Sequence, residues 1–331
     1  DESILNKINY AKKKELELIY FFGGSTMMSM GAVTPNFSIP SLVERILKKK
    51  YQKDVVCINY GLGGTCSREA LDLYIHEARM ISRLPKIIFY DGWNCASYLS
   101  LTQRLLDSNN LKSKNIVSYG DTMRTIEHNY NLSNTYNLYW HLSYVFKLSI
   151  AKIYNYFSPI FPNKINNIFA LLQSKFFSLN TSKFVSNLTE SLDASDLAIK
   201  NSMKKTINKY IDIHECANSI SGINSPNFIW AQQPLVFWGK KPLSKNEKLF
   251  KSTGLSSGDP RIFYEFEKCF NNQFKSKSNS ELHKSFYDLT GVFDNVDEEV
   301  YIDSGHINRL GNLIISASLS EIIFKKEGFL K

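Results

Sequence analysis

The chain has 331 residues, of which 43% are hydrophobic and 13% aromatic, so it can bury a large core. The formal charge of +9 lies in short lysine clusters that we interpret as solvated helix faces, with attraction to an anionic polymer or a membrane surface as the alternative. Five cysteines without a Cys-x-x-Cys pair argue against a disulfide framework and a zinc site, no nucleic-acid-binding motif accompanies the lysines, and we expect neither a metal nor a cofactor.

The predicted elements alternate between strands and helices along most of the chain. Strands are predicted near 16–22, 54–60, 86–91, 226–232 and 298–302, and helices near 39–51, 67–83, 96–108, 186–217, 260–287 and 308–326. This alternation is typical of a parallel sheet that helices cover on both faces. The sequence therefore predicts an α/β fold, a three-layer α/β/α flavodoxin-like sheet with a long helical insertion after the third strand.

A serine follows the first predicted strand, in the run Phe21-Phe22-Gly23-Gly24-Ser25-Thr26. Glycines permit a sharp turn at that point, and backbone N–H groups at the start of a helix attract negative charge. Ser25 can serve there as a nucleophile. Taken alone, Ser25 is better interpreted as a helix N-cap.

Three other loops follow predicted strands, namely 59–65, 91–94 and 301–306. In an open parallel sheet the carboxyl ends of the strands meet at one edge, and ligands bind outside that edge. We therefore expect these loops to converge on Ser25, although they are far apart in the sequence.

The residues in these loops complement the serine. His306 can accept the proton of Ser25, and Asp303 can hold the other nitrogen of the imidazole. A tetrahedral oxyanion needs preorganised donors, which the backbone N–H groups of Ser25 and Gly64 and the side-chain amide of Asn94 would supply. The pattern predicts acyl transfer through a Ser25-His306-Asp303 triad.

This set resembles the SGNH family of serine esterases and acyltransferases, also called GDSL-like hydrolases. Four segments are similar to its sequence blocks: Gly24-Ser25-Thr26, Asn59-x-x-x-x-Gly64, Gly92-Trp93-Asn94, and Asp303-x-x-His306 followed by Asn308-x-x-Gly311-Asn312. The resemblance spans residues 15–95 and 225–325 and leaves the stretch between them uncovered. It implies one domain of this type over 1–331, with a helical insertion at about 100–220.

Two positions depart from the family pattern. Gly24 stands where the family usually has an aspartate, a residue that mainly shapes the turn. Cys95 replaces the aspartate that commonly follows the asparagine of the third block, which leaves open how Asn94 is held.

The predicted insertion contains an aromatic stretch at 138–161. Lys147 and Lys152 interrupt it, which argues against a transmembrane span. We favour packing against the core, with a lid over the site or a surface resting on a membrane as the alternatives. Serine substitutions of Trp140, Tyr144 and Phe157 would separate these readings by their effects on substrate preference and stability.

The leading functional hypothesis is the removal of O-acyl groups, most plausibly O-acetyl, from a carbohydrate or polysaccharide. Trp93 could stack on a sugar or pack its own loop, and Gln233, which follows the fourth strand, could contact the substrate. The alternatives are a sugar O-acetyltransferase with the same triad, and a lipase or thioesterase whose lid is the insertion. A catalytically inactive carbohydrate-binding module is disfavoured because every catalytic position is filled.

The sequence leaves compartment and assembly open. The chain begins at Asp1 without a methionine, which we interpret as a fragment or a processed form, and an extracytoplasmic or membrane-associated location is one reading. The oligomeric state is not assigned. We expect the five histidines other than His306, including His214, to have structural or surface roles.

Overall fold

The computed structural model describes residues 2–32, 34–79, 85–100, 103–104, 195–222, 227–254, 259–275 and 281–330. Five strands form one sheet in the order β2-β1-β3-β4-β5, with every pair parallel. Their bounds are β1 Glu17–Gly23, β2 Val55–Gly61, β3 Lys86–Asp91, β4 Phe228–Gln232 and β5 Phe286–Asp288. This is the flavodoxin-like strand order, and it confirms the predicted three-layer α/β/α class.

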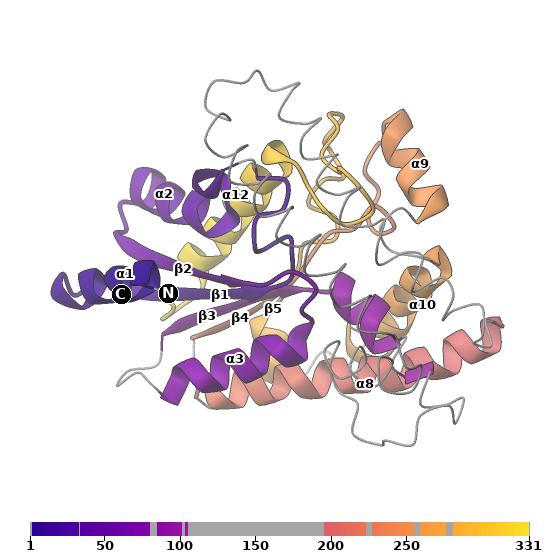
Figure 1. The fold of residues 1–331 in the computed structure, drawn as a ribbon, viewed down its shortest axis with the longest axis horizontal. Coiled ribbons are helices and arrows are strands. Elements are labelled where there is room, and N and C mark those ends of the chain that lie inside the picture. Colours follow the sequence, from indigo (N-terminus) through magenta and orange to yellow (C-terminus); the bar gives the residue numbers. More distant parts are fainter. Residues whose placement is uncertain are drawn as a thin grey trace, which may run out of the picture.

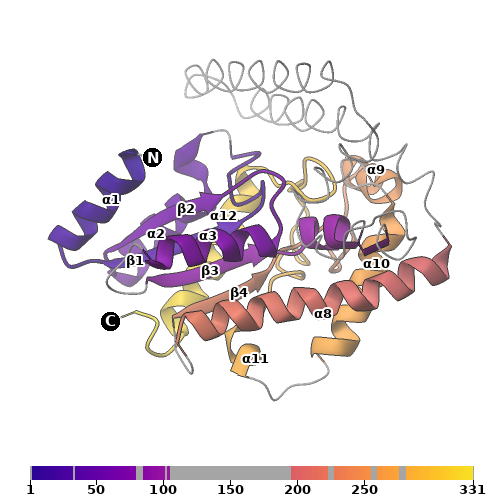
Figure 2. The same cartoon turned by 60° about the horizontal axis from the view of Figure 1, so that its bottom comes forward.

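Helices lie on both faces of the sheet, with α2 and α12 on one side and α3 and α8 on the other (Figure 1). The α-helices are α1 Glu2–Lys13, α2 Ile39–Tyr51, α3 Ser67–Arg79, α8 Asp196–Ile220, α9 Lys245–Thr253, α10 Pro260–Phe270, α11 Glu281–Ser285 and α12 Arg309–Lys325. The described residues also include short turns of 3₁₀-helix at Pro35–Phe37 and of π-helix at Cys95–Leu99 and Asn271–Lys275. Figure 2 shows α8 lying below β4 and extending past the end of the sheet toward α10.

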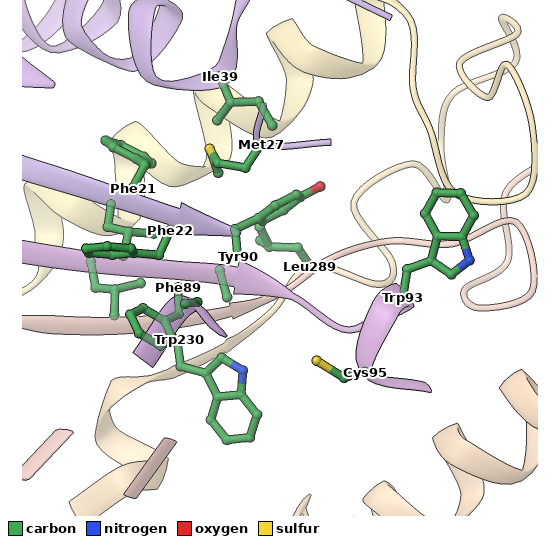
Figure 3. Packing of buried hydrophobic residues seen from close by; sticks show 14 of the residues in the cluster. Phe21, Phe22, Met27, Ile39, Phe89, Tyr90, Trp93, Cys95, Trp230 and Leu289 are labelled. Carbon is green, nitrogen blue, oxygen red and sulfur yellow. The ribbon is translucent and has the colours of Figure 1, made fainter. Parts of the chain in front are cut away.

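The strands are apolar on both sides because both of their faces are covered. Phe22 stacks on Tyr60 with ring centroids 5.1 Å apart. Successive β3 residues then point to opposite faces, so Phe89 lies with Trp230 on the α8 side and Tyr90 lies with Met27 on the other (Figure 3). The result is a rigid platform from whose carboxyl edge the functional loops emerge.

Side-chain caps fix where the helices near that edge begin. Ser38 caps α2 by accepting a hydrogen bond from the Ser41 amide at 3.3 Å. Asn308 caps α12 by accepting one from the Gly311 amide at 3.0 Å. Because α12 starts only three residues after His306, its cap also restrains the loop that carries this histidine.

The prediction of a strand at 298–302 is wrong. Tyr301 forms only an isolated antiparallel bridge with Ile307, and the fifth strand is β5. The amides of Val300 and Tyr301 donate to the Glu247 carboxylate at 2.9 and 3.1 Å, so a side chain takes the place of a neighbouring strand. Hydrogen bonds that backbone amides donate to a buried carboxylate from another segment leave no local sequence pattern.

The helix predicted at 260–287 is also wrong at its end, because Phe286–Asp288 form β5; its other described parts are α10, the π-helical turn and α11. Phe286 packs on Trp230 with ring centroids 4.8 Å apart and pairs with it in register, so tertiary contact overrides the helical pattern there.

The strands predicted near 16–22, 54–60, 86–91 and 226–232 and the helices predicted near 39–51 and 308–326 agree with the structure within a few residues, whereas α1 and α9 have no predicted counterpart. The helices expected at 96–108 and 186–217 lie partly outside the described residues. The aromatic stretch with Trp140, Tyr144 and Phe157 lies outside the described residues, as do most of the insertion and the end of the helix expected at 67–83. Among the helices that the structure describes, none has the length and apolar character needed to cross a membrane.

Candidate active site

Loops at the carboxyl edge of the sheet bring the sequence-predicted side chains together. Ser25 comes two residues after β1, and Gly64 and Asn94 each come three residues after β2 and β3. Ser25 lies in a tight turn, in which the Met30 amide donates to the Ser25 carbonyl at 3.0 Å. His306 arrives from the loop between β5 and α12.

Ser25, His306 and Asp303 form a continuous line of hydrogen bonds. The Nε2 atom of His306 lies 2.7 Å from Ser25 Oγ, and its Nδ1 atom lies 2.7 Å from Asp303 Oδ2. Asp303 is fully buried, and Ser25 and His306 are each 6% exposed. The line therefore runs from a buried carboxylate to a nucleophile near the surface.

The Asp303 carboxylate is held in its charged form. Burial by itself would raise the pKa of Asp303, but the charge and hydrogen bond of His306 lower it, and so do the backbone amides of Gly305 and His306. These amides donate to Oδ1 at 2.9 and 2.7 Å. The net effect is a pKa below the ordinary value for aspartate.

This arrangement selects one tautomer of His306. An ionised carboxylate only accepts hydrogen bonds, so Nδ1 carries the proton that faces Asp303. Nε2 is then left as the acceptor for the Ser25 hydroxyl. The imidazole is thus oriented to take the serine proton, as a general base must be.

Three potential oxyanion donors lie around Ser25. In the described part of the chain, neither the Ser25 amide nor the Gly64 amide donates a hydrogen bond. Gly64 has φ of +78°, a left-handed conformation that favours glycine. The Asn94 side chain donates one N–H to the Thr65 carbonyl at 2.6 Å, which ties this amide to the loop that carries Gly64.

Asn59 joins the nucleophile turn to the Gly64 loop. Its side-chain nitrogen donates to the Met27 carbonyl at 2.9 Å, and its side-chain oxygen accepts from the Gly61 amide at 2.8 Å. The Thr65 hydroxyl adds a hydrogen bond to the Gly23 carbonyl at 3.1 Å. Together these contacts give the asparagine of the second block a structural role.

Trp93 packs against the imidazole of His306. Their ring centroids are 4.5 Å apart at an interplanar angle of 77°, and Trp93 is 5% exposed. Gly305 makes this approach possible, because a Cβ on residue 305 would overlap the indole ring. Trp93 therefore packs its own loop against the imidazole, while its contact with a substrate stays a prediction.

Gln233 lies at the same edge, after β4. Its amide donates to the Asp91 carbonyl at 2.9 Å, and its side chain lies beside Gly92. Within the described residues its Nε2 atom has no hydrogen-bond partner. A contact between Gln233 and the substrate also stays a prediction.

Sequence reasoning missed two buried carboxylates beside the site. Glu247 holds the loop before Asp303 through the amides of Val300 and Tyr301. Asp91 ends β3 and accepts hydrogen bonds from four side chains, one of them that of His214. The only local signal was an aspartate at the end of an apolar strand, and nothing in the sequence pointed to its partners.

Comparisons with known proteins do not establish the chemistry, which is therefore inferred from the site itself. No protein-family profile matches the chain, and no curated protein matches its sequence. The fold is similar to the lipase Lip_vut3 from a goat rumen metagenome, with 10% identity over 95% of this chain and 99% of the other, and a TM-score of 0.45.

Two further solved structures show a similar level of likeness. A putative arylesterase from Agrobacterium tumefaciens str. C58 is 10% identical over 94% of this chain and all of the other, with a TM-score of 0.40. LAE5, an alpha/beta hydrolase from the metagenome of Lake Arreo, Spain, is 8% identical over 92% and 93%, with a TM-score of 0.38. Likenesses this distant carry no argument about activity.

Proposed function

We propose that this chain is an SGNH-type serine ester hydrolase that removes O-acyl groups, chiefly O-acetyl, from a carbohydrate. The observation that carries the proposal is the hydrogen-bonded line from Ser25 Oγ through His306 to Asp303 at the carboxyl edge of the sheet. Such a line activates a serine for attack on an acyl carbon.

Acylation follows from this geometry. Ser25 Oγ attacks the ester carbonyl while His306 Nε2 takes the hydroxyl proton, and the carbonyl oxygen becomes an oxyanion. The amides of Ser25 and Gly64 and the side chain of Asn94 donate to that oxygen. When the tetrahedral species collapses, His306 returns the proton to the departing alcohol oxygen and the acyl group stays on Ser25.

Deacylation repeats these steps with water. His306 takes a proton from the water as the water oxygen attacks the acyl carbon, and then returns it to Ser25 Oγ as the carboxylic acid leaves. Asp303 stays ionised throughout and stabilises the imidazolium that forms twice per cycle. Its lowered pKa supports this role.

The position of the alcohol supports a sugar as the leaving group. The alcohol oxygen must come within reach of His306 Nε2 to receive its proton, so the leaving group lies next to the imidazole and hence near Trp93. The chain's net positive charge would also favour an anionic polysaccharide.

Two exposed apolar residues favour a second candidate, hydrolysis of longer acyl esters as in a lipase or thioesterase. Met28 is 41% exposed and Leu62 is 51% exposed. The Leu62 amide donates to the Gly23 carbonyl at 3.0 Å, which places Leu62 beside the nucleophile turn. An acyl chain leaving the oxyanion site on this side would find apolar contacts.

A panel of esters tests the proposal. Purified protein would be incubated with p-nitrophenyl esters of increasing acyl length and with acetylated polysaccharide, with and without an acceptor sugar. Release of acetate supports the main proposal, preference for long chains supports the second candidate, and transfer to the acceptor without net hydrolysis identifies an O-acetyltransferase. If no acyl group is released or transferred, the proposal is wrong.

A further inference from the structure

Asp91, the last residue of β3, is a buried carboxylate that the proposed acyl-transfer steps do not use. It is 4% exposed. Its Oδ2 atom accepts from Ser67 Oγ at 2.6 Å, and its Oδ1 atom accepts from the Tyr210 hydroxyl at 2.6 Å. The indole N–H of Trp230 adds a longer contact to Oδ1 at 3.3 Å. Both carboxylate oxygens are therefore held by neighbouring side chains.

His214, on α8, contacts Asp91 through its imidazole ring. Its Nδ1 atom lies 2.7 Å from the Tyr210 carbonyl oxygen, and its Nε2 atom lies 3.1 Å from Asp91 Oδ2. Both ring nitrogens thus face oxygens that accept hydrogen bonds, and the ring is placed to donate from both. The imidazole also stacks on Trp230 at a centroid distance of 3.9 Å, which fixes the plane of the ring.

The surroundings of Asp91 favour its charged form. Burial by itself would raise the pKa of Asp91, but the charge and hydrogen bond of His214 lower it, and hydrogen bonds from Ser67 and Tyr210 act in the same direction. The net pKa is below the ordinary value for aspartate. Asp91 therefore stays charged and is a strong acceptor for Ser67.

Ser67 connects this pair to the oxyanion donors. It is the first residue of α3 and follows the Gly64 loop directly. Its amide lies 3.2 Å and its hydroxyl 2.8 Å from Cys95 Sγ, and Cys95 is the residue after Asn94. Ser67 thus joins the loop that carries Gly64 to the turn that carries Asn94.

Cys95 points away from the triad side of that turn. Figure 3 shows Trp93 and Cys95 leaving the turn after β3 in different directions, with Cys95 on the same side as Trp230. Trp93 contacts His306 on one side, and Cys95 contacts Ser67 on the other. The turn that carries Asn94 is thus held by the contact of Cys95 with Ser67, and Ser67 is itself held by its hydrogen bond to Asp91. This contact occurs where Cys95 departs from the family pattern.

We propose that Asp91 and His214 are positioning residues that act through Ser67 to set the separation between the Gly64 amide and the Asn94 side-chain amide. These donors lie on loops after different strands, so their spacing depends on the contacts that join the loops. The inference rests on the proposed ester hydrolysis, because it concerns the oxyanion site of that reaction. The sequence analysis expected only a structural or surface role for His214. The proposal gives this histidine a role in the reaction.

The decisive variant is Ser67→Ala, with Ser316→Ala as its matched control. Ser316 is also a fully buried serine, but it donates to the Asn312 carbonyl on α12, away from the site. Ser67→Ala should lower kcat on p-nitrophenyl acetate about 100-fold, as expected when catalytic groups shift by about 1 Å. KM should change by less than about twofold, because the lost interaction belongs to the transition state. Ser316→Ala should keep kcat.

A double-mutant cycle with Asn94→Ala distinguishes positioning from general destabilisation. If Ser67 acts through the oxyanion donors, Ser67→Ala should cost little further activity once the Asn94 amide is gone. Losses that multiply in the double variant would overturn the proposal. Asp91→Asn should change the kinetics as Ser67→Ala does, with a lowered kcat and a nearly unchanged KM. Unfolding curves would show whether each variant is folded under assay conditions.

Crystal structures of Ser67→Ala and Ser316→Ala give a readout that needs no substrate. The distance from Gly64 N to Asn94 Nδ2 should increase in the first variant and stay the same in the second. An unchanged distance in Ser67→Ala overturns the positioning role even if the protein hydrolyses no ester. Conversely, a wild-type protein without ester activity but with a widened site in Ser67→Ala would refute only the proposed function.

Discussion

The side-chain amide of Asn94 occupies the space where residue 24 would carry a side chain. A Cβ built on Gly24 would overlap Asn94 Nδ2 and would approach the Thr65 carbonyl oxygen to 3.2 Å. The glycine before the nucleophile is therefore matched to the asparagine of a different loop. Any side chain at position 24 would therefore require Asn94 to move.

Gly24→Ala should therefore disable the oxyanion site while leaving the triad in place. The new methyl group would displace Asn94, and the loss should resemble that of one oxyanion donor, about 100-fold to 1,000-fold in kcat. The measurement is steady-state kinetics on p-nitrophenyl acetate for Gly24→Ala, Asn94→Ala and the double variant. The double variant should be no slower than Asn94→Ala alone, and a full additional loss would contradict this account.

Ser25→Ala should abolish ester hydrolysis and leave the fold intact. Ser25 lies in a turn at the edge of the sheet, and the change removes only its hydroxyl and the hydrogen bond to His306. Thermal unfolding should therefore change little, and a fluorophosphonate probe should label the wild type at Ser25 but not this variant. Acyl release at the wild-type rate by Ser25→Ala would eliminate the mechanism.

His306→Ala should be about as damaging as Ser25→Ala, and the double variant no worse than either. Residues that act as one unit lose their contribution together, so their effects are not additive. Asp303→Asn should lose activity to a similar or smaller extent. The new side-chain amide can still face His306 Nδ1, but its N–H group can stabilise the wrong tautomer of the imidazole. Rates measured for all four variants test this, and a His306→Ala variant that keeps most of its activity would require another base.

Acidification should destabilise the protein through Asp91 and Asp303. The pKa values of both carboxyls are lowered in the folded state, so the unfolded chain binds more protons at low pH. Their stabilisation is present above the unfolded pKa of about 3.9 and is lost as the pH falls below it toward the lowered folded values. Urea unfolding of the wild type and Asp303→Asn across this range should show a weaker pH dependence in the variant, and identical slopes would refute the prediction.

Glu247→Ala should destabilise the protein much more than Glu321→Ala. Glu247 is fully buried and bridges Lys241 at 2.8 Å to the amides of Val300 and Tyr301. Its removal leaves a buried lysine without its partner, which typically costs about 3 to 5 kcal/mol. Glu321 pairs with Lys325 on an exposed helix face, so its loss should barely move the unfolding midpoint. Comparable midpoints for the two variants in urea would show that the buried pair is dispensable.

The sequence by itself was sufficient for four of the five strands and for the convergence of the candidate residues. Long apolar runs predicted β1 to β4, because strands covered on both faces must be apolar throughout. Once the strands are parallel, their carboxyl ends share an edge, which places the loops with Ser25, Gly64 and Asn94 together. Asp303 and His306 are three residues apart, so their contact was also readable from the sequence.

Only the tertiary structure decided the contacts between distant segments. Tyr301 lies in a loop held by Glu247, and not in the predicted strand, because a carboxylate from another segment satisfies its amide. Likewise, Asp91 contacts His214 of α8, and the two residues are far apart in the sequence. No local sequence pattern predicts this contact. Local patterns record which residues must be buried, whereas the partner of a buried charge is set by the packing of the whole chain.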